Sequence, residues 1–283
     1  MRGLLLLGLA LLASAAPAEA ASLDRAGRYL ESSLDARGCA REPGGTASAN
    51  LSAWVALGLA AAGRDARRPA ACIADHAHHL ERLTDVEICI LGLVAADADP
   101  RAAGGRDLVR IVASALRDGR IGTTVASNQF GILALRAAGA PVPAAARRTL
   151  LADQNADGGW PVGVGGDSDS NLTASGIDAA IAAGIAPTDR AVTRAVAALT
   201  RFRAAGGGYA LTLGSPADAQ STGWALSGLA AVRRDDAAAE RWLGALQRAD
   251  GSFGYQRGVR VTPVWVTAQA TMGLASRAFP MHP

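Results

Sequence analysis

Residues 154–160 read QNADGGW, and residues 247–253 read QRADGSF. Both follow the pattern Gln-x-x-Asp-Gly-small-aromatic, and a third, eroded copy, RAAGGGY, lies between them at 203–209. A turn motif that recurs about every 45 residues indicates stacked supersecondary units. We therefore expect a repeat fold whose main turn residues are Gln154, Asp157, Gly158 and Trp160 in one copy and Gln247, Asp250, Gly251 and Phe253 in the other.

Segments of two kinds alternate along the chain. One kind is apolar on nearly all sides, as a buried helix is, and covers residues 50–59, 85–96, 128–135, 171–183, 220–231 and 265–276. The other kind is amphipathic and covers residues 23–34, 68–83, 106–117, 144–153, 190–202 and 236–247. Polar starts and terminal glycines are typical of capped helices.

A single helix pair cannot bury an apolar inner helix, whereas a closed ring buries all the inner helices together. We therefore predict an all-α fold, an (α/α)6 toroid with an inner ring of six parallel helices and an outer ring of six. An open solenoid of the same pairs is the alternative.

The N-terminus has the features of a secretory signal peptide. Arg2 precedes an apolar run at 4–12, and residues 18–20 (AEA) have the small-x-small pattern of a cleavage site. We expect a signal peptide at 1–20, a single toroid domain at 21–283, and a secreted protein, either extracellular or in the cell envelope. An uncleaved anchor is the alternative. No later segment is long and apolar enough to predict a transmembrane helix.

Charge and cysteine content narrow the partners. The 28 basic residues are nearly balanced by 25 acidic ones, so we expect no nucleic-acid partner. We also expect a monomer.

Export permits one disulfide among Cys39, Cys72 and Cys89, with one thiol left over. We favour the Cys39–Cys89 pair, because both residues should lie near the face where the inner helices begin; three buried thiols are the alternative. The spacing matches no zinc site, so no metal is expected.

The turn motif has a structural explanation. Asp-Gly favours a tight turn with positive φ at the end of an outer helix. The glutamine can bond exposed backbone groups of a neighbouring helix end, and the aromatic ring can cover the junction between repeats.

At these residues the chain resembles a known superfamily. The two complete turn copies are similar to the QW motifs of the terpenoid cyclase and prenyltransferase α/α toroids, which include squalene–hopene cyclases and protein prenyltransferase β subunits. Residues 128–133 (NQFGIL) and 265–270 (WVTAQA) are similar to inner-helix starts of squalene-cyclase-like repeats. The specific motifs cover only the second half of the chain. The resemblance implies a toroid, which in this superfamily includes non-enzymatic carriers.

The resemblance also permits a test for cyclase activity. Class II cyclases carry Asp-x-Asp-Asp-Thr-Ala, and their middle Asp protonates the substrate. The best match is 169–174, which reads DSNLTA, so the acid position holds Asn171, and an amide cannot serve as that acid. Asp167 and Asp169 could serve only in another register, and a helix N-cap explains Asp169 or Asn171 equally well.

Two further features weaken an enzymatic reading. The chain is 4% aromatic, whereas a cation-forming cavity is expected to be lined with rings. Protein prenyltransferases need a zinc site of Asp, Cys and His, but the histidine cluster around His79 lies on an amphipathic segment, away from any inner-helix cysteine.

The toroid predicts where a ligand would bind. Parallel inner helices bring their N-termini, each carrying roughly +0.5 of an elementary charge, to one mouth. A polar rim above an apolar hole describes a small-molecule pocket or, equally, capped helices over a filled core. The candidate ligand-binding residues are Trp54, Asp85, Asn128, Asn171, Gln220, Trp224, Trp265 and Gln269.

Three functions remain in consideration. The first is a non-catalytic toroid that binds a hydrophobic or amphipathic small molecule, or a protein, without a cofactor. The second is a divergent terpenoid cyclase or prenyltransferase-like enzyme. The third is a carbohydrate-active α/α-barrel enzyme, for which Glu87 and Asp178 are the pair to examine, since such enzymes need carboxyls about 5–10 Å apart.

Overall fold

The computed structural model describes residues 21–281, so the signal peptide expected at 1–20 lies outside the described residues. Six helices form the inner ring: α2 (Ala49–Ala61), α4 (Leu83–Ala95), α6 (Val125–Ala137), α8 (Ser170–Ala182), α10 (Ala219–Ala231) and α12 (Pro263–Leu274). Six helices surround them: α1 (Leu23–Ser32), α3 (Arg67–His76), α5 (Leu108–Ser114), α7 (Ala144–Ala152), α9 (Arg190–Arg201) and α11 (Ala237–Gly244).

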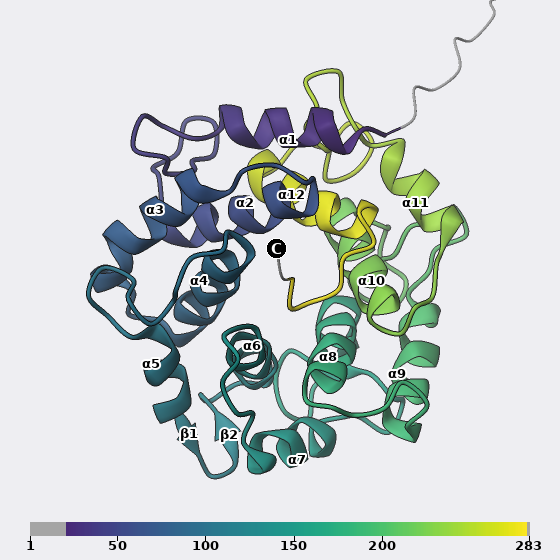
Figure 1. The fold of residues 1–283 in the computed structure, drawn as a ribbon. Helices are drawn as coiled ribbons and strands as arrows, with labels where there is room; N and C mark the ends of the chain where they lie inside the picture. The colour runs from purple at the N-terminus through teal and green to yellow at the C-terminus, as the bar shows by residue number, and fades with distance from the viewer. Residues whose placement is uncertain (1–20, 282–283) are drawn as a thin grey trace, which may run out of the picture.

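The inner helices close into a ring (Figure 1). Each contacts the next in chain order, and α12 packs directly against α2, which joins the last inner helix to the first. Helix α1 packs on α12 as well as on α2, so the outer layer also spans the junction. The predicted (α/α)6 toroid is therefore confirmed, and the open solenoid is excluded.

Close backbone approach holds parts of the inner ring together. Gly92 of α4 lies so near α2 that a Cβ added to it would be 2.8 Å from the Cα of Ala53. Gly228 of α10 stands in the same relation to Ala174 of α8, at 2.9 Å. Because glycine has no side chain, neighbouring apolar helices can pack at these positions with their backbones nearly in contact. The inner helices are accordingly buried on almost every side.

The remaining regular elements are short. Strands β1 (Leu116–Arg117) and β2 (Arg120–Ile121) pair in register Leu116 to Ile121, and β3 (Trp160–Pro161) pairs with β4 (Ser168–Asp169) in register Trp160 to Asp169. A 3-10 turn, η1 (Ala77–His79), follows α3. Each strand pair lies in a connection between an outer and an inner helix, so these strands shape turns and do not add a sheet layer.

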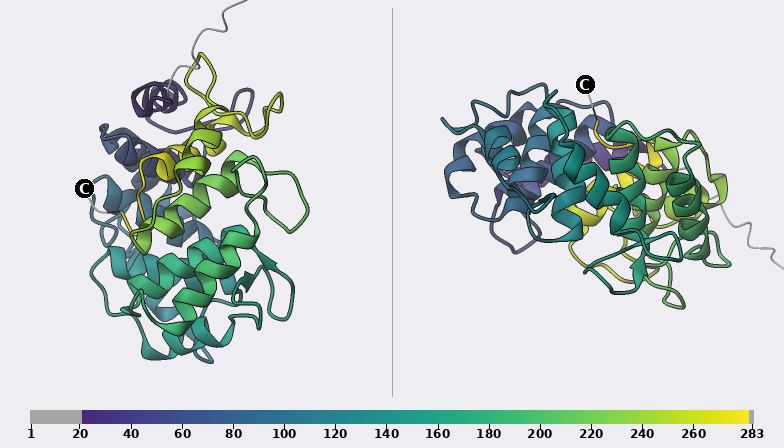
Figure 2. Two further views of the ribbon diagram at one scale, coloured as in Figure 1. Left: turned by 90° about the vertical axis from the view of Figure 1, so that its right-hand side faces the viewer. Right: turned by 90° about the horizontal axis from the view of Figure 1, so that it is seen from below.

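The two faces of the ring differ. Three loops, at 161–168, 210–217 and 254–262, protrude from the face where α8, α10 and α12 begin (Figure 2). They carry most of the large apolar side chains exposed among the described residues, at Val162, Val164, Leu211, Leu213, Val259 and Val261. The C-terminal segment lies on the opposite face (Figure 2). Within the part of the chain described, no helix has the length and apolar character needed to cross a bilayer.

Candidate functional site

The motif glutamines join each turn to the next outer helix. Gln154 Nε2 donates to the carbonyl oxygens of Gly158, in its own turn, and of Ala191, in the first turn of α9, at 2.9 and 2.8 Å. Gln247 Nε2 donates to the carbonyl oxygens of Ser22 (2.9 Å) and Gly251 (3.3 Å). Its Oε1 accepts from the backbone N–H of Ser22 at 2.8 Å, so Gln247 fastens the last turn to the start of the first helix.

The motif aromatics are anchored by threonines that the sequence analysis missed. The backbone N–H groups of Trp160, Tyr209 and Phe253 donate to the hydroxyls of Thr173, Thr222 and Thr267, at 3.1, 2.9 and 2.9 Å. All three aromatic side chains are buried. A threonine 13 or 14 residues after each motif aromatic was the signal available in the sequence.

One further turn copy was also missed. At 34–40 the first and last residues, Leu34 and Ala40, form a bridge, as Gln247 and Phe253 do. This copy has neither the glutamine nor the aromatic residue. The β1–β2 connection makes a different turn, because Leu116 pairs with Ile121 and both Asp118 (φ 49°) and Gly119 (φ 83°) have positive φ.

The residues that match the cyclase acid motif form the N-terminal cap of helix α8. Asp169 Oδ1 accepts from the Leu172 N–H at 2.8 Å and so caps α8, while burial raises the pKa of this carboxyl. Asp167 is exposed, and Asn171 is half-buried. Asp218 caps α10 in the same way, accepting from Ser221 N–H at 2.8 Å. Because the arrangement recurs in a repeat that has no acid motif, Asp169 is positioned as a structural residue.

An aromatic cluster lies inside the inner ring. The ring centroids of Trp54 and Trp224 are 5.9 Å apart, and those of Trp54 and Trp265 are 6.4 Å apart. Phe130, which the sequence analysis did not single out, meets Trp224 at 5.8 Å. The structure thus brings together all three tryptophans predicted as ligand-binding, from helices α2, α10 and α12, and adds a ring from α6.

Two polar atoms beside this cluster have no partner among the described residues. Trp265 Nε1 and Gln269 Oε1 are both buried and make no hydrogen bond. The two residues are four apart on α12, and this spacing places them on one face of the helix. A buried donor and a buried acceptor without partners are costly, by about 1–3 kcal/mol each, unless something else satisfies them.

The other predicted rim residues divide into two groups. Asp85 accepts from Asn50 Nδ2 at 2.7 Å and is half-buried, as are Asn171 and Gln220. Asn128, in contrast, is fully buried. Its Oδ1 accepts from Ile121 N–H and its Nδ2 donates to the Ala146 carbonyl oxygen, at 3.1 and 3.0 Å. Asn128 therefore connects a turn to α7, and its role as a ligand-binding residue stays a prediction.

Glu87 and Asp178 share no partner. Glu87 lies on α4, is fully buried and has no hydrogen bond to either oxygen. Asp178 lies on α8, where its Oδ2 is 3.1 Å from Ser227 Oγ and its Oδ1 accepts from Phe279 N–H at 3.3 Å. Desolvation raises the pKa of both carboxyls well above the ordinary range. Helix α6 stands between α4 and α8 in the ring.

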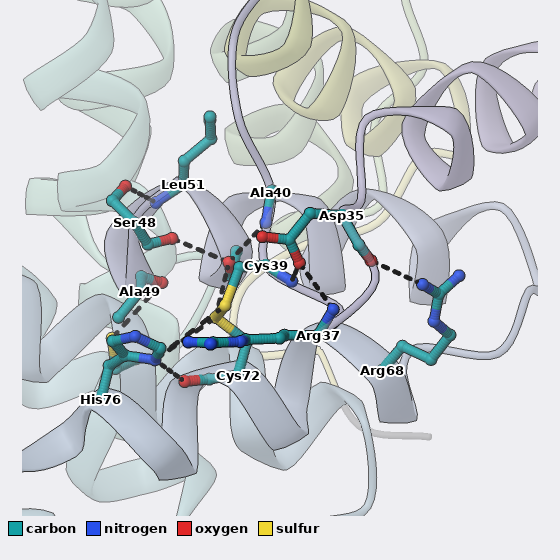
Figure 3. The surroundings of a disulfide bond; sticks show 12 residues. Asp35, Arg37, Cys39, Ala40, Ser48, Ala49, Leu51, Arg68, Cys72 and His76 are labelled. Atoms are coloured by element: carbon teal, nitrogen blue, oxygen red, sulfur yellow. Dashed lines mark hydrogen bonds between the residues drawn. A yellow bond between two sulfur atoms is a disulfide. The ribbon is translucent and has the colours of Figure 1, made fainter. Parts of the chain in front are cut away.

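The disulfide prediction was wrong. Cys39 is bonded to Cys72 (Figure 3). Cys89 is a buried free thiol. Gly38, at φ 84°, packs its turn onto the backbone of Arg68 in α3, the helix that carries Cys72. Cys89 instead lies inside α4, with its thiol near the Ala49 carbonyl oxygen, and burial raises its pKa. The sequence analysis expected Cys39 near the face where the inner helices begin. In the structure the turn that carries Cys39 packs on the outer helix α3.

His76 adjoins the disulfide. Its Nδ1 lies 3.0 Å from the Cys72 carbonyl oxygen and 3.9 and 3.7 Å from the sulfurs of Cys39 and Cys72. These three side chains form a compact group of possible metal ligands. In this structure, however, both cysteines are in the disulfide bond, which removes their thiolates as ligands.

Two surface cavities are lined by residues outside the tryptophan cluster. One of about 370 Å³ is lined by Tyr29, Glu42 and Arg260 among others, beside the start of α12. Another of about 470 Å³ lies between α3 and the end of α4. Glu42 accepts from the N–H groups of Val264 and Trp265, both at 2.9 Å, so it serves as the cap of α12.

The comparisons with known proteins point to one fold. No family model and no curated protein matches the chain. Among solved structures, the type II terpene cyclase MstE from Scytonema has a TM-score of 0.70 at 15% identity, covering 89% of this chain and 96% of that one. Protein geranylgeranyltransferase-I from Candida albicans has a TM-score of 0.64 at 10% identity, covering 89% and 90%.

A glycosidase solved in complex with glucose is also similar, with a TM-score of 0.59 at 15% identity, covering 90% of this chain and 97% of that one. Sequence identities this low establish architecture and not activity. Together with the closed ring of helix pairs, they show that this chain has an α/α-toroid fold like that of the terpene cyclase and the prenyltransferase.

Proposed function

We propose that the protein binds a hydrophobic or amphipathic small molecule without transforming it, at the mouth of the ring where the inner helices begin. The observation that carries this proposal is the pair of unpartnered polar atoms beside the aromatic cluster, Trp265 Nε1 and Gln269 Oε1. A ligand hydroxyl can accept from the indole N–H and donate to the amide oxygen, satisfying both atoms at once.

The ligand class follows from the wall of the site. Trp54, Phe130, Trp224 and Trp265 offer apolar faces from four inner helices. Phe130 and Trp265 are half-buried, which favours an approach from this mouth. A structure of the similar cyclase MstE contains geranylgeranyl dihydroxybenzoate, and the similar transferase was solved with GGPP. We infer that the ligand is an isoprenoid chain ending in a hydroxyl.

The absence of catalysis is part of the proposal. The acid position of the cyclase motif holds Asn171, and the buried Asp169, two residues earlier in the chain, is engaged in capping α8. Incubation with geranylgeranyl substrates should therefore yield no cyclised product by gas chromatography and mass spectrometry. A cyclised product whose formation is lost in Asp169→Asn would overturn this part of the proposal.

Binding can be tested by titrating tryptophan fluorescence with geranylgeraniol. We expect saturable quenching, and we expect the corresponding hydrocarbon without the hydroxyl to bind more weakly. Losing one neutral hydrogen bond should cost about 0.5–1.5 kcal/mol, or roughly 2- to 13-fold in Kd. Trp265→Phe and Gln269→Leu should each lose that factor for the alcohol and leave the affinity for the hydrocarbon nearly unchanged.

The matched control is Trp242→Phe. Trp242 lies on the outer helix α11, where Gly206 and Gly208 pack near its ring, so this variant should bind the alcohol as the wild type does. The proposal fails if the wild type shows no saturable change, or if Trp242→Phe and Trp265→Phe weaken binding equally.

We also propose that the protein is exported. Support comes from the signal-like residues 1–20 and from the Cys39–Cys72 disulfide, a bond that persists mainly in oxidising compartments. N-terminal sequencing of protein recovered outside the cytosol should begin at Ala21. Recovery of the full-length chain from the cytosol would contradict the proposal.

A further inference from the structure

The last described residues of the chain cross the axis of the ring. After α12 ends, the segment 275–281 turns back and runs over the centre of the ring, on the face opposite the three protruding loops (Figures 1 and 2). Phe279 and Met281 are each only 3% exposed, although they stand within a few residues of the end of the chain. The segment is therefore packed into the ring.

Polar contacts fix this segment to two inner helices. Ser227 Oγ lies 3.0 Å from the Arg277 carbonyl oxygen and 3.1 Å from Asp178 Oδ2, and Asp178 Oδ1 accepts from Phe279 N–H at 3.3 Å. A serine hydroxyl has one hydrogen, which can satisfy the carbonyl. A protonated Asp178 then donates to Ser227, in agreement with the raised pKa that desolvation gives this carboxyl. Every partner in the network is satisfied in this protonation state.

The aromatic ring of the segment meets the cluster from the other side. Phe279 stacks on Trp224, with centroids 5.3 Å apart and planes 21° from parallel. Trp224 itself contacts Trp54 and Phe130. The same indole thus touches the proposed ligand wall and the C-terminal segment, so Phe279 lies where a ligand extending along the axis would end.

We propose that Phe279, held by Asp178 and Ser227, is the floor of the ligand site and sets the longest isoprenoid chain that it accepts. This inference rests on the proposed function. It makes Phe279 a specificity-determining residue, and it assigns Asp178 a positioning role in place of the catalytic role considered from the sequence.

The test compares chain lengths. Kd values are measured for farnesol, geranylgeraniol and geranylfarnesol, with the wild type, Phe279→Ala and a chain that stops after Ala278. Shortening the floor should let the longest alcohol bury its last isoprene unit. At about 0.8 kcal/mol for each buried CH₂, two more buried carbons strengthen binding at least tenfold. Farnesol should bind all three proteins within about twofold of one another.

The control variant is Arg277→Gln, which alters an exposed side chain of the same segment and should keep the wild-type length preference. If both shortened proteins gain the same factor for every alcohol, the segment competes with the ligand and is not a floor. If their length preference equals that of the wild type, Phe279 does not bound the site. Either result overturns the inference while leaving the proposed function standing.

A second measurement does not depend on the proposed ligand. An apolar cavity left by a truncated core side chain can bind benzene. Benzene should therefore raise the melting temperature of Phe279→Ala but not that of the wild type or Arg277→Gln. If benzene does so and no alcohol binds any protein, Phe279 fills the axis but the proposed function is wrong. If Phe279→Ala fails to fold, Phe279→Leu takes its place in both measurements.

Discussion

Gln247 should contribute more to the closure of the ring than Gln154, its counterpart in the middle of the chain. Gln247 makes four hydrogen bonds, to both backbone polar groups of Ser22, to the Gly251 carbonyl oxygen and from the Arg25 guanidinium at 3.1 Å. Three of them join the last turn to the first helix, across 222 or 225 residues of chain. Gln154 makes two, one of which reaches the next helix.

The expected losses of stability follow from the number of hydrogen bonds that each glutamine makes. A hydrogen bond in a folded protein contributes a net of about 1 kcal/mol. Gln247→Ala should therefore lower the free energy of unfolding by about 4 kcal/mol, and Gln154→Ala by about 2 kcal/mol. For a chain of this size, 1 kcal/mol corresponds to about 2–4 °C in Tm, so Gln247→Ala should melt at least about 8 °C lower.

Urea unfolding followed by circular dichroism measures both free energies. Gln256→Ala, in the loop that follows the last turn, is the control. It should change stability by less than about 0.5 kcal/mol, because among the described residues its side chain forms no hydrogen bond to another repeat, and substitutions away from such contacts rarely exceed that size. Equal losses for Gln247→Ala and Gln154→Ala would refute the reasoning that the ring is fastened at residue 247.

Two other predictions concern the disulfide and a buried acid. The Cys39–Cys72 bond spans a sequence separation of 33, for which loop-closure entropy predicts about 4 kcal/mol of stabilisation. The double variant Cys39→Ser, Cys72→Ser should lose that amount, and non-reducing peptide mapping should pair these two residues, whereas a Cys39–Cys89 peptide would contradict the structure. Burial raises the pKa of Glu87 well above the ordinary value of 4.5, so the folded state holds a proton that the unfolded state releases. Its stabilising contribution is complete below that value and is lost as pH rises towards the folded pKa. Glu87→Gln should therefore make the free energy of unfolding fall less steeply above pH 4.5 in a urea series, and an unchanged slope would contradict this assignment.

The repeat architecture was predictable because its turns use distinctive side chains in two copies. Gln154 and Gln247 bond backbone groups of the next helix, and few residues other than glutamine can both donate and accept at that distance. The turn at 34–40 has the same backbone bridge without the glutamine, and many side chains suffice for such a bridge. This first-half copy therefore escaped detection.

The candidate site was predictable only in part, for a related reason. Tryptophans placed on predicted inner helices had to face one another once the ring closed, and they do. Phe279 lies outside every repeat, and its position on the axis depends on Asp178 and Ser227, which belong to other repeats. The predicted cysteine pairing was wrong for a similar reason, because the correct pairing depends on the packing of the turn at Gly38 against α3.

The start of α8 separates what the fold requires from what a cyclase would require. Asp169 caps the helix, and Thr173 holds the backbone of Trp160, so both residues are tied into the repeat. Asp218 and Thr222 do the same at α10. The side chain of Asn171 takes no part in these contacts: it is half-buried at the mouth, and its Oδ1 accepts from the adjacent Ser170 hydroxyl. An acid there would serve chemistry and not folding. An asparagine at this position therefore leaves the toroid, its caps and its aromatic cluster in place, and it is compatible with the proposed binding function, which needs no acid there.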